Sequence, residues 1–138
     1  MTAQQYLDRV SMFELFIKSN QREIEKLNVQ ATGLSGKGFD ERIQSSKRTS
    51  FLDSILDRIA LLREKIEKDT ENYYSSKIEA WDAINSVKNE DERLVLRMRY
   101  IEGMKFKDIS KEMHRSERGI YNIHKRALEN IEIPESVQ

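Results

Sequence analysis

The sequence predicts an all-α protein, in which a long helical hairpin or coiled coil precedes a compact module of three short helices. Three observations lead to this class. Apolar residues recur at alternating steps of three and four over two long stretches, as they do along one face of a helix. Gly is scarce, with five residues in 138, and the only Pro is Pro134. No stretch shows the two-residue alternation that predicts a strand.

The first predicted helix covers residues 2–30. Asn20 is the one polar interruption of its heptad pattern, and Leu7 and Phe16 widen the apolar stripe. The seam positions are Ala3, Tyr6, Val10, Phe13, Ile17, Asn20, Ile24 and Leu27. A helix this exposed needs a partner that covers the seam.

Residues 31–40 predict a Gly-rich connector, since three Gly lie within six positions and Gly weakens a helix. The stretch GLSGKG, Gly33 to Gly38, superficially resembles a phosphate-binding loop. It lacks the four residues between the glycines, the Ser or Thr after the Lys, and the preceding strand that such a loop needs.

The second predicted helix begins between Ser45 and Ser50 and runs to about Val87. Its seam positions are Leu52, Ile55, Ile59, Leu62, Ile66, Asp69, Tyr73, Ser76, Ala80, Ala83 and Val87. The polar middle weakens the seam, so Ile78, Trp81 and Ile84 could take over on a shifted face. Both an antiparallel hairpin and pairing with a second copy of the chain satisfy this pattern.

Residues 89–138 predict a separate module after the hairpin region of residues 1–88. Asn89 is the expected N-cap of a third helix, which ends near Gly103 and has Leu94, Val95, Met98 and Tyr100 as apolar candidates. A fourth helix begins at Lys105 or Phe106 and ends at Met113. Ser116 caps a fifth helix that runs to about Ile131.

The fourth and fifth predicted helices have the layout of a helix-turn-helix, with the joint at Met113-His114-Arg115-Ser116. The inward positions are Phe106, Ile109, Ser110 and Met113, then Ile120, Ile123, Ala127 and Leu128. The outward positions of the fifth helix are Glu117, Arg118, Tyr121, Asn122, Lys125 and Arg126. Arg can bind guanine and Asn can bind adenine through two hydrogen bonds, and Lys and Arg suit phosphates.

The excess of basic residues coincides with this module. Residues 105–126 contain seven Lys or Arg and three Asp or Glu, whereas residues 1–89 contain 14 of each. The chain as a whole has 24 basic and 24 acidic residues, so its formal net charge is zero. This balance argues against coating nucleic acid by bulk charge and permits a local basic surface.

The run from Asn89 to Ile131 resembles region 4 of bacterial sigma factors, the domain that reads the −35 promoter element. The resemblance covers about a third of the chain. It rests on ERLVLRMRY (Glu92 to Tyr100), Gly103, Asp108-Ile109-Ser110, Ser116-Glu117-Arg118, Ile123 and Lys125-Arg126-Ala127-Leu128. In layout, a helical N-terminal part with a sigma-like C-terminus is similar to small phage-encoded regulators of the ArpU and RinA type.

The sigma-factor resemblance implies that Glu117, Arg118 and Asn122 face bases in the major groove. It implies positions near the DNA backbone for Ser116, Lys125 and Arg126, and we expect further backbone contacts from Lys105, Lys107, Lys111, Arg115 and Tyr121. Three residues depart from the family pattern. His114 stands where a small residue, often Gly, is usual, Arg115 replaces an apolar turn residue, and Gly119 lies inside the recognition helix.

An enzyme is not expected. The chain has no Cys, and its two His, His114 and His124, have no second ligand or base spaced to join them. We expect these His to contact phosphate or solvent, and we expect no metal or cofactor. No apolar run approaches the roughly 20 residues of a membrane span, and the N-terminus lacks a secretory pattern. A cytoplasmic protein without membrane contact is expected.

The expected function is sequence-specific binding of double-stranded DNA by a transcriptional regulator of phage or prophage genes, with residues 116–131 in the major groove. Dimerisation through the N-terminal helices would place two modules on two half-sites. Two alternatives stay open. One is a DNA-packaging protein similar to small terminase subunits of phages. The other is a coiled-coil interaction module that binds a protein such as RNA polymerase and does not bind DNA.

Overall fold

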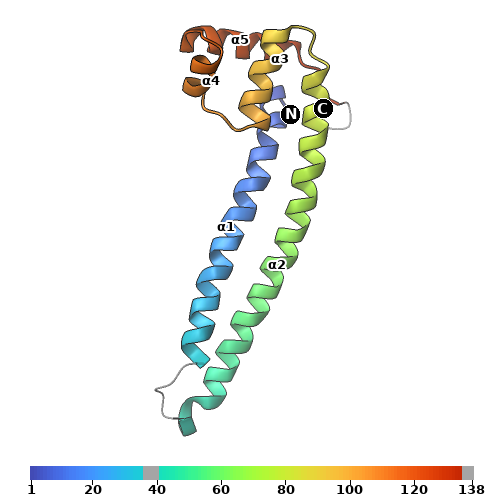
Figure 1. The fold of residues 1–138 in the computed structure, drawn as a ribbon. Helices are drawn as coiled ribbons and strands as arrows, with labels where there is room; N and C mark the ends of the chain where they lie inside the picture. Colours follow the sequence, from blue (N-terminus) through green and yellow to red (C-terminus); the bar gives the residue numbers. More distant parts are fainter. Residues whose placement is uncertain (36–40, 135–138) are drawn as a thin grey trace. The chain divides into compact units, whose positions relative to one another are not determined.

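The computed structural model describes residues 1–35 and 41–134, and these residues form five α-helices and one π-helical turn with no strand (Figure 1). The elements are α1 (Ala3–Ser35), α2 (Glu41–Asn85), α3 (Glu90–Leu96), the π turn η1 (Arg97–Ile101), α4 (Phe106–Glu112) and α5 (Glu117–Asn130). The all-α class is therefore confirmed. The chain packs as two compact units, one of residues 14–71 and one that joins residues 1–13 to the chain from residue 72 onward.

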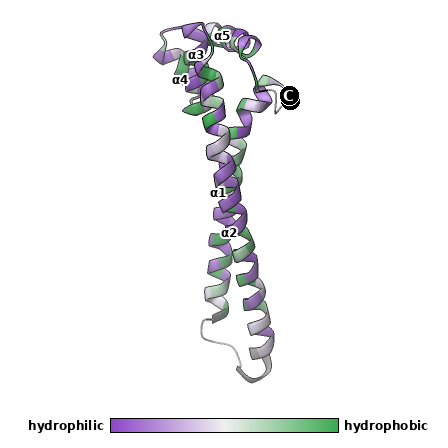
Figure 2. Ribbon diagram, turned by 90° about the vertical axis from the view of Figure 1, so that its right-hand side faces the viewer, coloured by the Kyte–Doolittle hydropathy of each residue, from purple (hydrophilic) through white to green (hydrophobic). Residues whose placement is uncertain are grey.

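The unit of residues 14–71 is a helical hairpin, in which α1 and α2 run side by side in opposite directions (Figures 1 and 2). Figure 2 shows hydrophilic and hydrophobic residues alternating along both helices. The predicted seam is confirmed, because every one of its positions in this unit is buried or half-buried: Ile17, Asn20, Ile24, Leu27, Leu52, Ile55, Ile59, Leu62, Ile66 and Asp69.

The predicted connector is wrong in part, since residues 31–35 continue α1 and α2 already begins at Glu41. The remaining connector residues, 36–40, lie outside the described part of the chain. A single Gly costs a helix only about 1 kcal/mol against Ala. Leu34 lines an apolar hollow together with Phe51 and Ile55, and the Arg48 side chain donates a hydrogen bond to the Leu34 carbonyl. These contacts offset the cost of Gly33.

Asp69 is the polar exception in the hairpin seam. Asp69 is 6% exposed, and its Oδ2 atom has no hydrogen-bond partner among the described residues. A buried acceptor without a donor costs about 1–3 kcal/mol. We therefore expect Asp69→Leu to raise the free energy of unfolding by about that amount, as measured by urea denaturation.

The matched control for this substitution is Asp57→Leu, because Asp57 is exposed on the same helix. We expect a change within about 0.5 kcal/mol for this variant. If Asp69→Leu were instead less stable than the parent chain, the Asp69 carboxylate would have a stabilising partner and the argument from burial would be wrong.

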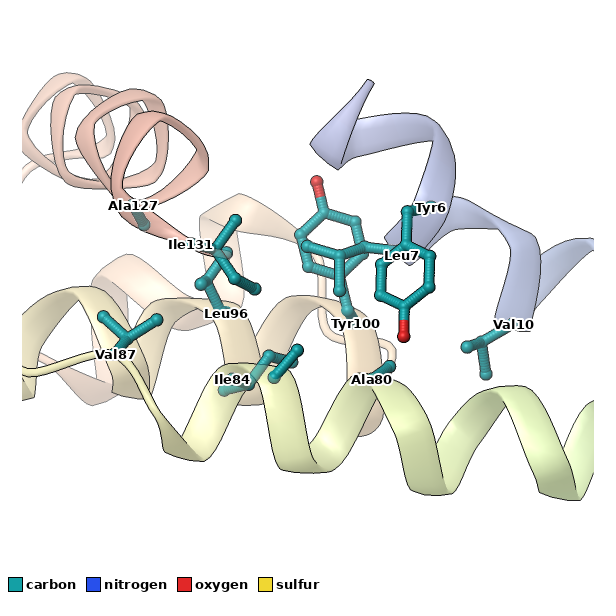
Figure 3. Packing of buried hydrophobic residues seen from close by; sticks show 11 residues of the cluster. Tyr6, Leu7, Val10, Ala80, Ile84, Val87, Leu96, Tyr100, Ala127 and Ile131 are labelled. Atoms are coloured by element: carbon teal, nitrogen blue, oxygen red, sulfur yellow. The ribbon is translucent and has the colours of Figure 1, made fainter. Parts of the chain in front are cut away.

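In the other unit, the start of α1 packs against the end of α2 and against the C-terminal helices (Figure 3). Thr2 and Gln5 begin α1 with reciprocal hydrogen bonds between side chain and backbone, of 3.1 and 2.9 Å. The shared core consists of Tyr6, Leu7, Val10, Ala80, Ala83, Ile84, Val87, Leu96, Tyr100, Ala127 and Ile131. The first residues of the chain thus complete the core of the C-terminal helices.

The predicted shift of face in α2 is wrong for Ile78 and Trp81, which are 63% and 37% exposed. The heptad seam instead continues through Ser76, Ala80 and Ala83, all of which are buried. Their small side chains allow a close approach of the packed helices. Similarly, Leu7 widens the buried stripe of α1 as predicted, whereas Phe16 is exposed.

A second core lies among α3, η1, α4 and α5. Its buried members are Val95, Met98, Ile109, Ile120 and Ile123, and Met104, Phe106 and Met113 pack against them. The inward positions predicted for the fourth and fifth helices are confirmed, since all eight are buried or half-buried. This core determines which surface α5 leaves exposed.

The third predicted helix is α-helical only to Leu96 and continues as the π turn η1, which ends before Gly103. The amide of Glu102 donates to the Arg97 carbonyl at 3.0 Å, five residues back. Leu96 and Tyr100, four positions apart, join the first core, while Met98 joins the second. Leu94 is 38% exposed and is not the core residue that was predicted. Gly103, at φ 71°, ends the segment as predicted.

Candidate nucleic-acid interface

The joint between α4 and α5 is closed by backbone hydrogen bonds at the end of α4. The amide of His114 donates to the Lys111 carbonyl at 3.3 Å, and the amide of Arg115 donates to the Ser110 carbonyl at 3.0 Å. This pair of bonds defines a Schellman motif, whose C′ residue takes a left-handed conformation. His114 occupies that position at φ 54°, where the sigma-like pattern commonly has Gly.

The start of α5 is held by the predicted cap. The Ser116 Oγ atom accepts a hydrogen bond from the Gly119 amide at 3.0 Å. A Cβ atom at Gly119 would lie 3.2 Å from that Oγ atom. Because Gly119 has no Cβ atom, it leaves room for this cap at the N-terminus of α5.

All residues predicted to contact DNA are exposed, on α4, on the joint and on α5: Lys105, Lys107, Lys111, Arg115, Ser116, Glu117, Arg118, Tyr121, Asn122, Lys125 and Arg126. On α5, Arg118, Asn122 and Lys125 follow one another at helical spacing and share one face. The opposite face of α5 is buried through Ile120, Ile123 and Ala127. The packing thus presents the predicted contact face to solvent.

Most cations of this face have no internal partner. Among the residues that the structure describes, the only ion pair of the predicted contact set joins Arg115 to Asp91. Lys105, Lys107, Lys111, Arg118, Lys125 and Arg126 form none with the described residues. Because no nearby carboxylate is bonded to them, their charge is available to an external anion.

Tyr121 packs against another aromatic ring although it is 52% exposed. Its ring centroid lies 4.6 Å from that of Phe106, and the Arg99 guanidinium lies 4.3 Å from the Phe106 centroid on α4. The ring contact ties α4 to α5 beside the exposed face. Tyr121 therefore has a packing role, and whether it also contacts the DNA backbone stays a prediction.

His124 is buried, and the expectation that it contacts phosphate or solvent is wrong. Its Nε2 atom lies 2.7 Å from the Tyr100 hydroxyl, and its ring makes an edge contact with Phe106 at 4.9 Å. Burial lowers the pKa of His124, and the nearby Arg99 charge lowers it further. Burial, with a smaller contribution from Asp8, raises the pKa of Tyr100 to about 12. Both groups are therefore neutral at pH 7.

The position of His124 could have been read from the sequence. Residues 120, 123, 124 and 127 follow the i, i+3, i+4, i+7 spacing of a buried helix face, and the other three positions hold Ile120, Ile123 and Ala127. Because His is a polar residue type, His124 was expected to contact phosphate or solvent despite this spacing.

The His124 environment predicts a pH dependence of stability. Because the folded pKa lies below the unfolded value of about 6.5, the unfolded state binds the proton first as the pH falls. The stability that neutral His124 contributes is complete above pH 6.5 and is lost as the pH falls from there through the lowered pKa. We expect the free energy of unfolding to decrease in this window, and His124→Phe to weaken the decrease. An unchanged slope in that variant would contradict the assignment.

The described residues define an all-α protein in which a short joint connects α4 to α5, whose outward face is exposed. Residues 34–132 match the family described as "Protein of unknown function (DUF1492)". The chain belongs to this family, because the match covers well over half of it. Neither a curated protein nor a solved structure matches the chain.

Two further features bear on the site. No group of three or more His, Asp or Glu within the described residues could hold a metal ion. In the same part of the chain, no helix is long and apolar enough to cross a membrane.

Proposed function

We propose that this protein binds double-stranded DNA sequence-specifically through α5 and acts as a transcriptional regulator, with phage or prophage genes as its targets. One observation carries the proposal: α4 and α5 are joined by a four-residue turn, and all but one of the cations on their outward face form no ion pair with the described residues. An α-helix fits the major groove of B-DNA, and unpaired Lys and Arg side chains bind phosphates.

In this proposal, the start of α5 enters the major groove. Glu117, Arg118 and Asn122 face base edges, since Arg bonds well to guanine, Asn to adenine, and Glu to the amino group of cytosine. Lys125 and Arg126, further along α5, contact the DNA backbone. So do Lys107 and Lys111 of α4 and Lys105, which directly precedes α4. Ser116 and Arg115 supply contacts at the joint.

The testing experiment is a selection of bound duplexes from a randomised library with the full-length chain. The salt concentration is held constant, because phosphate contacts make affinity steeply salt-dependent. An enriched motif is expected, and a two-fold repeat within it would report a dimer and the spacing of its half-sites. Binding without an enriched motif would favour a DNA-packaging role. No binding would favour a module whose partner is a protein such as RNA polymerase.

A base contact by Arg118 makes a specific prediction for Arg118→Ala. On the selected motif we expect a loss of roughly 1–3 kcal/mol of binding free energy, with relaxed preference at one base position. The comparison variant is Arg126→Ala, which should weaken binding to every sequence alike and reduce the salt slope by about one. Both effects are measured by titrating labelled duplexes that differ at single positions. Uniform weakening by Arg118→Ala would show that Arg118 contacts phosphate instead.

A further inference from the structure

Arg115 differs from the other cations of the proposed DNA-binding face because it already has an anionic partner. Its Nη2 atom lies 2.7 Å from Oδ2 of Asp91, and each side chain is 47% exposed. This distance is that of a charge-assisted hydrogen bond. In the described part of the chain, no other cation of the predicted contact set forms an ion pair.

The backbone holds both partners in place. The Arg115 amide is bonded to the Ser110 carbonyl, and the next residue, Ser116, caps α5. Asp91 lies in the first turn of α3, which Asn89 caps through a 3.0 Å hydrogen bond to the Glu92 amide. The ion pair therefore brings a carboxylate from α3 to the joint that leads into the proposed recognition helix.

The Asp91 carboxylate shares its chemistry with a DNA phosphate, because both present anionic oxygens that a guanidinium binds well. We propose that Asp91 is an internal competitor of DNA phosphate at Arg115. In the free protein Asp91 holds the guanidinium, and on binding DNA the guanidinium exchanges the carboxylate for a phosphate oxygen. This inference rests on the proposed function, since it concerns the same DNA-binding face.

The exchange is energetically accessible. Ion pairs exposed to solvent contribute about 0–1 kcal/mol, so a phosphate in the high local charge of DNA displaces the carboxylate at little cost. The exchange also reduces the binding free energy gained from the contact between Arg115 and phosphate, because the released Asp91 carboxylate must take up a counterion or water. Asp91 thus lowers the sequence-independent part of the affinity and leaves a larger share of it to base contacts.

The test variant is Asp91→Asn, which removes the charge and keeps the size of the side chain. The cap of α3 by Asn89 does not involve Asp91. Glu90→Gln is the matched control, because Glu90 lies in the same turn, is exposed, and forms no ion pair with the described residues. Arg115→Gln and the double variant with Asp91→Asn complete the set.

The measurement is the affinity of each full-length variant for one duplex of arbitrary sequence over a series of salt concentrations. We expect Asp91→Asn to bind about 3–10-fold more tightly at low salt, with a log–log salt slope steeper by about one. Glu90→Gln reports the effect of removing any nearby negative charge and should change affinity about twofold or less. In the Arg115→Gln background, Asp91→Asn should have no more effect than Glu90→Gln.

Two results would overturn the inference while leaving the proposed function intact. Asp91→Asn could behave like Glu90→Gln, or its gain could persist in the Arg115→Gln background, which would mean that the Asp91 charge acts at long range. A parent chain that is folded by circular dichroism and binds no duplex even at low salt would overturn the proposed function and this inference together.

Discussion

Charge reversal at Lys125 and Arg126 is expected to lower the affinity for duplex DNA by on the order of 100-fold or more at moderate salt. Both side chains are exposed on α5, and neither is bonded to a carboxylate of the described residues. Replacing both by Glu would remove the two proposed phosphate contacts and place two negative charges against the DNA backbone. The loss should be largest at low salt, where screening is weakest.

The control for this variant is Arg22→Glu with Lys26→Glu, which makes the same change of net charge on exposed positions of α1 in the hairpin unit. Helix content, measured by circular dichroism, should be unchanged in both double variants. We expect the control to bind DNA nearly as well as the parent chain. An equal loss in both would show that only net charge matters, and no loss in either would remove α5 from the interface.

The seam of the hairpin was predictable because burial in a heptad follows position more strictly than residue type. Asp69 and Ser76 are polar, yet both are buried at the seam positions that the period assigns to them. Conversely, Ile78 is apolar and exposed, because its position lies off the seam. At these three positions residue type and period disagreed, and the period was right, as it was for His124 on α5. Leu7 and Ile84, by contrast, lie off the seam and are buried.

The heptad period could not show which helix surfaces pack against one another. Tyr6 and Leu7 are at predicted apolar positions, but nothing in the local sequence indicates that they pack with Tyr100 and Ile131. The π turn of residues 97–101 was likewise not expected from the sequence. Such features arise from tertiary packing and leave no local pattern.

The exposed face of α5 could be read from helical spacing, whereas its ion pair and its buried hydrogen bond could not. The Arg115–Asp91 and Tyr100–His124 contacts each join residues 24 positions apart. Each links α5 or its joint to the segment that begins with α3. Contacts of this range require the packed helices. The ion pair of Arg115, which among the described residues is formed by no other predicted contact cation, therefore had no signature in the sequence.

Truncation of Ile120 to Ala is expected to destabilise the unit that contains α5 by about 2–5 kcal/mol, because it leaves a cavity in a packed core. Ile120 is fully buried and packs with Val95, Ile109 and Ile123. The free energy of unfolding is measured by urea denaturation followed by circular dichroism. Ile78→Ala removes the same atoms from an exposed position of the same unit, and we expect it to cost no more than about 0.5 kcal/mol.

The milder variant Ile120→Val separates packing from DNA contact. It should cost about 0.5–1.5 kcal/mol of stability while the folded protein keeps the affinity of the parent chain, since Ile120 lies on the buried face of α5. If the variant remained folded but lost DNA affinity, the exact packing of Ile120 would be needed to position the outward residues of α5. Equal stability losses in Ile120→Ala and Ile78→Ala would contradict the orientation of α5 itself, and with it the face on which the proposed function depends.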